Sequence, residues 1–173
     1  KTTIMKKLLI LAVILFGFVA TSNAQGVHLG FKAGVNFADV TGDFDADGRT
    51  GYHIGGVLDL SLSDKFSVQP EVIYSAQGTD DTDIDYLNIP VLAKIKITEY
   101  FDIHAGPQFG FVVNDDFEAG EPESFDFSGA VGVGAQFSSF FAQLRYNIGV
   151  TDIVNDVDTK NAVFQVSVGY RIF

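Results

Sequence analysis

Residues 140–148 read FFAQLRYNI, and apolar and polar side chains alternate along nearly all of this stretch. Alternation with a period of two is typical of a β-strand whose two faces meet different environments. One face carries Phe140, Ala142, Leu144, Tyr146 and Ile148. The opposite face carries Phe141, Gln143, Arg145 and Asn147. The stretch therefore predicts a strand with one apolar and one largely polar side.

The same alternation recurs throughout the chain after residue 25, where no stretch shows a convincing helical period. None of the apolar faces carries a charged residue, whereas the other faces mix charged, amide and hydroxyl side chains with glycine. Two closed sheets fit this pattern: a soluble lipocalin-like barrel with the apolar face inside, and a membrane barrel with that face against lipid. The predicted strands are 27–37, 52–62, 66–77, 86–97, 101–113, 125–137, 140–148 and 162–172.

Three features favour the membrane barrel. Glycine is frequent on the polar face, where small side chains suit the narrow lumen of an eight-stranded barrel. Phenylalanine and tyrosine gather near the strand ends, as in aromatic girdles at two membrane interfaces. Short and long connections alternate, which is typical of periplasmic turns and outer loops. We therefore predict an all-β, eight-stranded antiparallel up-and-down transmembrane β-barrel in a bacterial outer membrane, with extracellular loops and both termini periplasmic. The long connections are 38–51, 78–85, 114–124 and 149–161.

Three prolines, Pro70, Pro90 and Pro107, fall inside predicted strands. Each proline removes one N–H donor from the ladder of backbone hydrogen bonds. Because a closed barrel has no edge at which to place them, we predict local β-bulges at these positions.

The first 25 residues have the order of an export signal. Met5 is followed by two lysines, by the apolar run LLILAVILFGFVA ending at Ala20, and by small residues up to Ala24. The apolar run is too short to span a bilayer, so a secretory signal peptide is favoured over a membrane helix. We predict that residues 1–24 are a signal peptide with a short upstream extension and that residues 25–173 are one barrel domain.

Composition excludes several function classes. The 173 residues include no cysteine, which rules out disulfides, thiolate metal sites and cysteine catalysis. Acidic residues number 22 against 11 basic ones, for a net charge of −11. Nucleic acid is therefore not an expected partner, because binding phosphates requires a basic face.

Several short motifs resemble one family. Residues 86–90 read YLNIP, residues 34–37 read GVNF, residues 70–75 read PEVIYS, and residues 169–171 read GYR. In this order they resemble strands of the porin-family, PorT-like outer-membrane β-barrels of Bacteroidota, and the resemblance covers essentially all of residues 27–173. It implies an eight-stranded outer-membrane barrel, a group mostly without a defined activity.

Charged side chains on the polar face would lie inside a membrane barrel. Charges away from water must be paired, so we predict a lumenal ion-pair network that fills and orders the barrel. Counting residues back from the short turns places several of these residues at similar heights, and places Lys96 opposite Asp102. The alternative is that they line a narrow, selective water path. The predicted network comprises Lys32, Asp59, Glu71, Lys94, Lys96, Asp102, Arg145 and Arg171.

The remaining candidate sites are weaker. His28, His53 and His104 share the lumenal face but do not converge, so a three-histidine metal site is not expected. His53 is predicted near the outer rim, where some membrane barrels place catalytic residues, yet no catalytic spacing accompanies it.

The predicted outer loops hold 16 of the 22 carboxylates. Asp43, Asp45 and Asp47 with Gly48 spell the first half of a calcium loop, but Ile54 stands where a bidentate glutamate belongs. We therefore predict at most weak Ca²⁺ binding at the rim and no other cofactor.

The leading functional hypothesis is a non-enzymatic outer-membrane barrel with a structural or surface-interaction role. The alternative is a narrow porin or channel for small solutes, and the third hypothesis is a hydrolase at the rim. The expected partners are the lipid bilayer of the outer membrane, the barrel-assembly machinery that would insert the chain, and a surface ligand that the sequence does not name.

Overall fold

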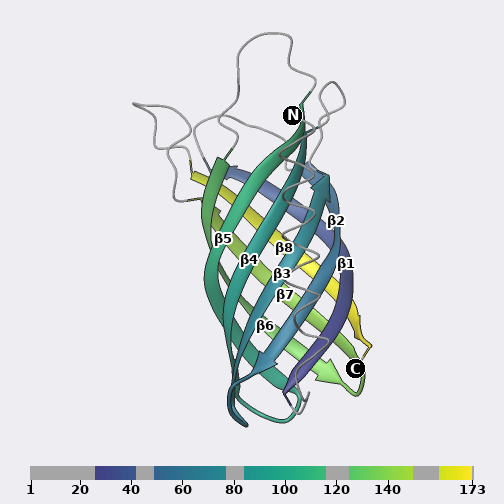
Figure 1. Ribbon diagram of the computed structural model, residues 1–173. Helices are drawn as coiled ribbons and strands as arrows, with labels where there is room; N and C mark the ends of the chain where they lie inside the picture. Colours follow the sequence, from purple (N-terminus) through teal and green to yellow (C-terminus); the bar gives the residue numbers. More distant parts are fainter. Residues whose placement is uncertain (1–25, 42–48, 77–83, 116–124, 150–159, 173) are drawn as a thin grey trace.

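The computed structural model describes residues 26–41, 49–76, 84–115, 125–149 and 160–172. Eight antiparallel strands close into one barrel in the order in which they occur along the chain (Figure 1). This confirms the predicted fold class. The strands are β1 (Val27–Thr41), β2 (Arg49–Ser61), β3 (Phe66–Ala76), β4 (Ile84–Lys96), β5 (Phe101–Asp115), β6 (Phe125–Phe137), β7 (Phe140–Gly149) and β8 (Lys160–Arg171).

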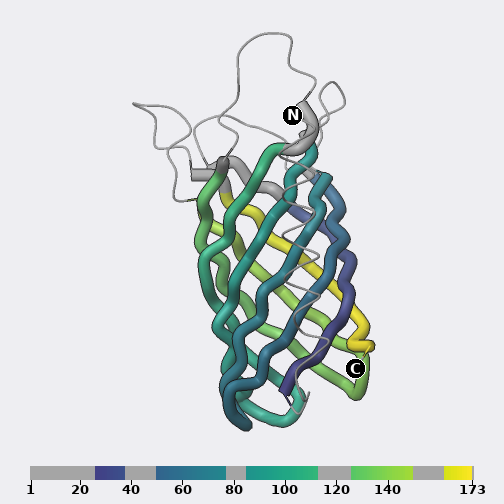
Figure 2. The backbone as a smooth tube through the Cα atoms, viewed as in Figure 1, coloured from purple at the N-terminus to yellow at the C-terminus, as the bar shows by residue number. Residues whose placement is uncertain are grey.

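The barrel closes because β1 pairs with both β2 and β8. Lys32 on β1 lies opposite Gly55 of β2 on one side and Gly169 of β8 on the other. The strands run obliquely to the long axis of the barrel, which closing so few strands requires (Figure 2). Closure leaves no strand edge exposed.

Several strands extend further into the long connections than the sequence predicted. β1 continues to Thr41, β5 continues to Asp115, and β4 already begins at Ile84. Asp39, Asp85 and Asp115, which were expected in loops, therefore lie within strands. The backbone ladder of a hairpin does not depend on apolar side chains, so it continues where the hydrophobic alternation stops.

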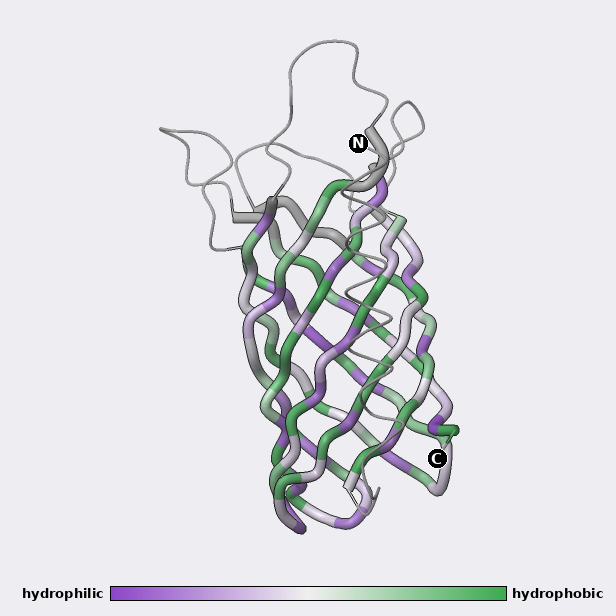
Figure 3. The backbone as a smooth tube through the Cα atoms, viewed as in Figure 1, coloured by the Kyte–Doolittle hydropathy of each residue, from purple (hydrophilic) through white to green (hydrophobic). Residues whose placement is uncertain are grey.

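The two faces of the wall have opposite polarity. Hydrophobic and hydrophilic residues alternate along each strand (Figure 3). Side chains such as Phe31 and Val131 point outward with about half of their surface exposed, at 54% and 51%. Lys32 and Glu71 point inward and are 0% and 1% exposed. An apolar exterior around a polar interior is the arrangement of transmembrane barrels. Separately, the described residues contain no helix long and apolar enough to cross a membrane.

The two ends of the barrel differ. At the turn end lie the short connections 62–65, 97–100 and 138–139, together with the start of β1 and the end of β8 (Figure 1). The two-residue turn between β6 and β7 places Ser138 at a φ of 56°, the left-handed backbone that tight hairpins need at their first central position. We call the opposite end, which the longer connections face, the loop end.

Outward aromatic rings pair near both ends. Toward the turn end, Tyr170 contacts Phe31 and Phe140, with ring centroids 6.0 Å and 5.1 Å apart. Toward the loop end, Phe37 lies 6.4 Å from Phe164 between ring centroids. Such rings suit the interfaces of a bilayer, where an aromatic side chain meets both lipid and headgroups.

The three prolines do not produce the bulges that we predicted. The register is the same on either side of each proline, and only two residue pairs are skipped beside each one. One missing N–H accounts for both skipped pairs, because neighbouring pairs of an antiparallel ladder share that hydrogen bond. The register shift that does occur lies elsewhere, between Asp85 and Tyr86 against β5.

Candidate functional site

The centre of the lumen is occupied by three charged side chains from three different strands. Glu71 of β3 accepts two hydrogen bonds from the guanidinium of Arg145 on β7, at 2.7 and 2.8 Å. The Nζ atom of Lys32 on β1 lies 2.7 Å from the same carboxylate. We call Lys32, Glu71 and Arg145 the central cluster. One carboxylate faces two cations there, so the cluster carries one net positive charge.

Two glutamines complete the hydrogen bonding of the central cluster. Gln143 Oε1 accepts hydrogen bonds from Lys32 Nζ at 3.2 Å and from Arg145 Nη2 at 3.3 Å. Gln69 Nε2 donates to Glu71 Oε1 at 2.6 Å. Both glutamines are buried. Gln143 disperses part of the positive charge and Gln69 stabilises the carboxylate, and these hydrogen bonds compensate for removing the ions from water.

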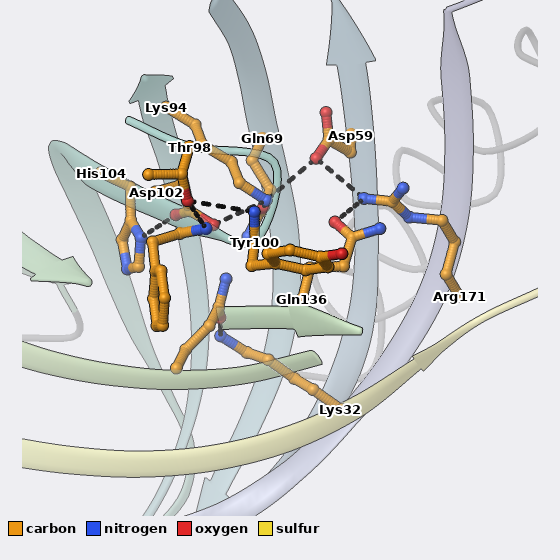
Figure 4. Close-up of polar contacts among 12 residues, drawn as sticks. Lys32, Asp59, Gln69, Lys94, Thr98, Tyr100, Asp102, His104, Gln136 and Arg171 are labelled. Atoms are coloured by element: carbon orange, nitrogen blue, oxygen red, sulfur yellow. Dashed lines mark hydrogen bonds and ion pairs between the residues drawn. The ribbon is translucent and has the colours of Figure 1, made fainter. Parts of the chain in front are cut away.

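A second group lies nearer the turn end, and we call it the turn-end cluster (Figure 4). Lys94 Nζ lies 3.2 Å from Asp59 Oδ2 and 3.5 Å from Asp102 Oδ2. Arg171 Nη2 lies 3.6 Å from Asp59 Oδ2 and donates to Gln136 Oε1 at 2.7 Å. Asp102 also contacts His104 Nδ1 at 3.0 Å. Gln69 joins the two clusters, because its Oε1 accepts from Lys94 at 3.2 Å while its Nε2 donates to Glu71.

The structure places seven of the eight predicted network residues in these two clusters; the exception is Lys96. Lys96 lies opposite Asp102 in the ladder, but its side chain is exposed and forms no ion pair with any residue that the structure describes. Lys94 approaches Asp102 instead. The glutamines that bridge the charges were not predicted, since the sequence offers no signal beyond their place on the polar face.

A neutral hydrogen-bonded group lies toward the loop end. His53 contacts Asn36 Oδ1 through Nδ1 at 2.7 Å and Ser167 Oγ through Nε2 at 2.8 Å. Asn36 Nδ2 donates to Ser75 Oγ, and Gln165 Nε2 donates to Asn36 Oδ1. Asn36 Oδ1 is thus an acceptor, so His53 Nδ1 carries the proton and Nε2 accepts from Ser167.

This group has the order of a serine–histidine–asparagine triad, but it is enclosed. His53 and Ser167 are 1% and 2% exposed. The sequence placed His53 on the lumenal face near the outer rim; the side chain does face the lumen, and it lies four residues inside β2, which begins at Arg49. A nucleophile must reach its substrate, and Ser167 has only 2% of its surface exposed.

Some buried polar atoms have no hydrogen-bond partner in the protein. The described residues with such an atom are His28 (Nδ1), Ser67 (Oγ), His104 (Nε2), Gln108 (Oε1), Arg145 (Nε), Asn147 (Oδ1) and Gln165 (Oε1). Separately, a cavity with room for about one water molecule lies at the turn end, lined by side chains that include His28, Asp59, Lys94 and Arg171.

No metal-binding arrangement occurs in the part of the chain that the structure describes, where no three histidine, aspartate or glutamate side chains converge. The candidate calcium residues Asp43, Asp45 and Asp47 lie outside the described residues.

A sequence model of one family, described as "Outer membrane protein beta-barrel domain", matches residues 22–155, which is well over half of the chain. The chain belongs to this family. It is therefore a bacterial outer-membrane β-barrel protein, in agreement with the predicted location. A search of curated protein sequences finds no significant match to this outer-membrane barrel.

Solved structures with the same fold include membrane barrels of different roles. Ail, the attachment invasion locus protein of Yersinia pestis, is similar with a TM-score of 0.57 and 14% identity, covering 85% of this chain and 99% of Ail. The N-terminal β-barrel domain of OprF from Pseudomonas aeruginosa has a TM-score of 0.53 and 13% identity, covering 86% and 100%. The outer membrane enzyme PagL has a TM-score of 0.58 and 10% identity, covering 82% and 98%. At these identities the likeness concerns the fold alone.

Proposed function

We propose that this outer-membrane barrel is non-enzymatic, with a structural or surface-interaction role and a lumen closed to solutes. The observation that carries the proposal is the central cluster. Lys32, Glu71 and Arg145 reach across the lumen from three strands, and each is at most 1% exposed. An eight-stranded barrel is just wide enough for side chains to fill, and these side chains are long and mutually bonded.

Conductance in planar lipid bilayers tests this proposal against the narrow-channel alternative. Purified wild-type protein should give little or no stepwise current. A triple variant, Lys32→Ser, Glu71→Ser and Arg145→Ser, removes the central cluster without leaving a lone buried charge and should conduct if it folds. Folding is checked by the mobility of unheated samples in SDS gels. Large, steady channels from the wild type would favour the porin alternative.

A hydrolase is the third hypothesis, and the enclosed position of His53 and Ser167 argues against it. We expect no hydrolysis of lipid or ester substrates above the level of a Ser167→Ala variant. Activity that is lost in both Ser167→Ala and His53→Ala, with folding retained, would contradict the non-enzymatic proposal.

The loops would supply the surface role. By sequence, the predicted outer loops carry 16 of the 22 carboxylates, and basic residues there are limited to Arg49 and Lys160. Such loops repel anions and attract cationic partners. Separately, the resemblance of YLNIP at 86–90 to PorT-like barrels of Bacteroidota supports the non-enzymatic part of the proposal, since that group mostly lacks a defined activity.

Weak Ca²⁺ binding at Asp43, Asp45 and Asp47 remains a proposal that rests on sequence. Millimolar Ca²⁺ should protect residues 38–51 from proteolysis more than NaCl of the same ionic strength. Asn at all three positions should abolish the difference. Equal protection by both salts would mean that the loop holds no calcium site.

Export is likewise proposed from sequence, because residues 1–24 lie outside the described residues. The mature protein from the membrane fraction should begin at Gln25. Membrane-inserted protein that still begins at Met5 would contradict cleavage of a signal peptide.

A further inference from the structure

The lumenal face of β6 differs from those of its neighbours in having only small side chains along its middle. Its inward positions there are Ser128, Ala130, Gly132 and Gly134. The strands on either side carry long polar side chains on the same rungs, that is, at positions that pair with these residues in the sheet. Gln108 of β5 lies opposite Ser128, and Asn147 of β7 lies opposite Ala130. On the next inward rung, Gly132 of β6 pairs with His104 of β5 on one side and with Arg145 of β7 on the other. We call this strip of small residues on β6, flanked by the longer side chains of β5 and β7, the trough, and β6 its floor.

Each of the four long side chains along this trough has a buried polar atom without a partner. Gln108, Asn147, His104 and Arg145 are 6%, 4%, 2% and 1% exposed. Their unpartnered atoms are Oε1, Oδ1, Nε2 and Nε, respectively. His104 Nε2 points at the floor, since a Cβ on Gly132 would lie only 2.6 Å from it. Unpaired buried groups are rare in native proteins, and bound water is the usual partner of those that occur.

The chemistry of the four atoms selects the ligand. His104 Nδ1 faces a carboxylate oxygen of Asp102, so it carries the proton and Nε2 is an acceptor. Gln108 and Asn147 present carbonyl oxygens, whereas Arg145 Nε–H is a donor. A cation would satisfy the acceptors but would be repelled by Arg145, and an anion would be repelled by the carbonyl oxygens. Water donates and accepts, so it can serve all four.

We propose that a file of bound water occupies this trough, from the rungs of Gln108 and Asn147 to the rung of His104 and Arg145. The file ends toward the turn end at Gly132, where a Cβ would lie 2.6 Å from His104 Nε2, so that the imidazole covers the floor and its Nε2 is the last acceptor of the file. At Gly134 the Asp102 carboxylate covers the floor in the same way, at 2.5 to 2.9 Å from a Cβ. Apolar side chains of the opposite wall, Ile73 and Leu92, are buried and give water no partner there. The file links the central and turn-end clusters through Arg145 and His104, and it does not depend on whether the lumen conducts.

The test is magnetisation transfer from water to side-chain amides, measured by NMR on the wild-type barrel in phospholipid nanodiscs. The amides of Gln108 and Asn147 should receive magnetisation several-fold faster than the amide of Gln143. Gln143 is a matched control, because it is buried in the same lumen but its Oε1 atom accepts from Lys32 and Arg145. Equally slow transfer at all three amides would overturn the proposal.

A variant that fills the trough sharpens the test. Ala130→Leu places a large side chain on the floor and should abolish the fast transfer at Asn147 and Gln108. Ala142→Leu adds the same volume on the lipid-facing side of β7, where residue 142 is exposed, and should leave the transfer unchanged. Fast transfer that persists in folded Ala130→Leu would place the water elsewhere and overturn the proposal. The wild-type comparison stands even if Ala130→Leu fails to fold.

Discussion

The wall formed by β2 to β5 and the wall formed by β7, β8 and β1 are held together in different ways. In the first wall, each of three neighbouring strand pairs loses two register pairs beside a proline. In the second wall, the residue pairing runs through without such gaps. The interrupted wall supplies every carboxylate of the two ion clusters, namely Asp59, Glu71 and Asp102, together with one cation, Lys94. The continuous wall supplies the other three cations, Lys32, Arg145 and Arg171.

This division has a structural consequence. Glu71 and Asp59 are attracted across the lumen by cations of the continuous wall, whereas Asp102 pairs with Lys94 of its own wall. The Arg145–Glu71 pair joins residues 74 positions apart in sequence, and Lys32–Glu71 joins the opposite edge of the continuous wall to the same carboxylate. Within the interrupted wall, Lys94 of β4 pairs with Asp59 of β2 and with Asp102 of β5, so side-chain pairs also connect strands whose backbone ladders lack bonds. The comparison teaches that the lumenal charges brace a weakened wall as well as fill the barrel.

The largest expected effect comes from removing the charge that joins the walls. Glu71→Gln keeps the shape of the side chain but leaves Lys32 and Arg145 facing each other without a carboxylate. Breaking a buried pair by removing one partner costs about 3–5 kcal/mol. The midpoint of denaturant unfolding in detergent micelles, with its slope, measures this loss.

Lys96→Gln is the matched control for that experiment. It removes an exposed charge on the interrupted wall that has no ion-pair partner among the described residues. Its unfolding free energy should stay within about 0.5 kcal/mol of the wild type. If Glu71→Gln is no more destabilising than Lys96→Gln, the ion pairs do not brace the barrel.

A smaller effect is expected from a single methyl group on β6, which lies between the two walls. A Cβ at Gly132 would overlap the carbonyl oxygen of Leu144 and lie 2.6 Å from His104 Nε2. Gly132→Ala should therefore destabilise the barrel by about 1–3 kcal/mol, the usual cost of overpacking. Gly129→Ala, on the same strand, meets no atom within 4 Å and should change stability little. Equal effects of the two variants would mean that the wall adjusts freely at Gly132.

Much of this architecture could be predicted from sequence, because a period of two needs only polarity at each position. The alternation in residues 140–148 places Arg145 inward and Leu144 outward, as the structure does. The barrel follows from eight such segments, and the membrane orientation follows from their glycines and aromatic residues. Each of these inferences depends on side-chain type alone.

The pairing of particular charges could not be predicted in the same way. Counting from the turns placed Lys96 opposite Asp102, which is correct for the backbone, yet Lys94 approaches that carboxylate. A long side chain reaches past its own rung, and the stagger of tilted strands decides which partner it meets. The bridging by Gln69 and the unpartnered atoms along β6 depend on the same three-dimensional detail.

The smallest effect concerns the ladder gaps themselves. Pro107→Ala restores an N–H that would donate to the Val91 carbonyl oxygen and recover the skipped pairs of Val91 and Leu92. The acceptor is close, because a Cβ on the adjacent Gly106 would overlap that oxygen. The new hydrogen bond contributes about 0.5–1.5 kcal/mol, but the unfolded chain gains flexibility worth about 0.4–1 kcal/mol. The net change in the free energy of unfolding should therefore be close to zero.

Hydrogen exchange separates the new hydrogen bond from the added flexibility of the unfolded chain, because it reports the bond directly. The amide at position 107 should exchange as slowly as those of the uninterrupted β5–β6 ladder nearby. Fast exchange at position 107 in a folded variant would mean that β4 and β5 are held apart by something other than the missing donor. The contrast between the walls would then lie in strand separation rather than in proline chemistry.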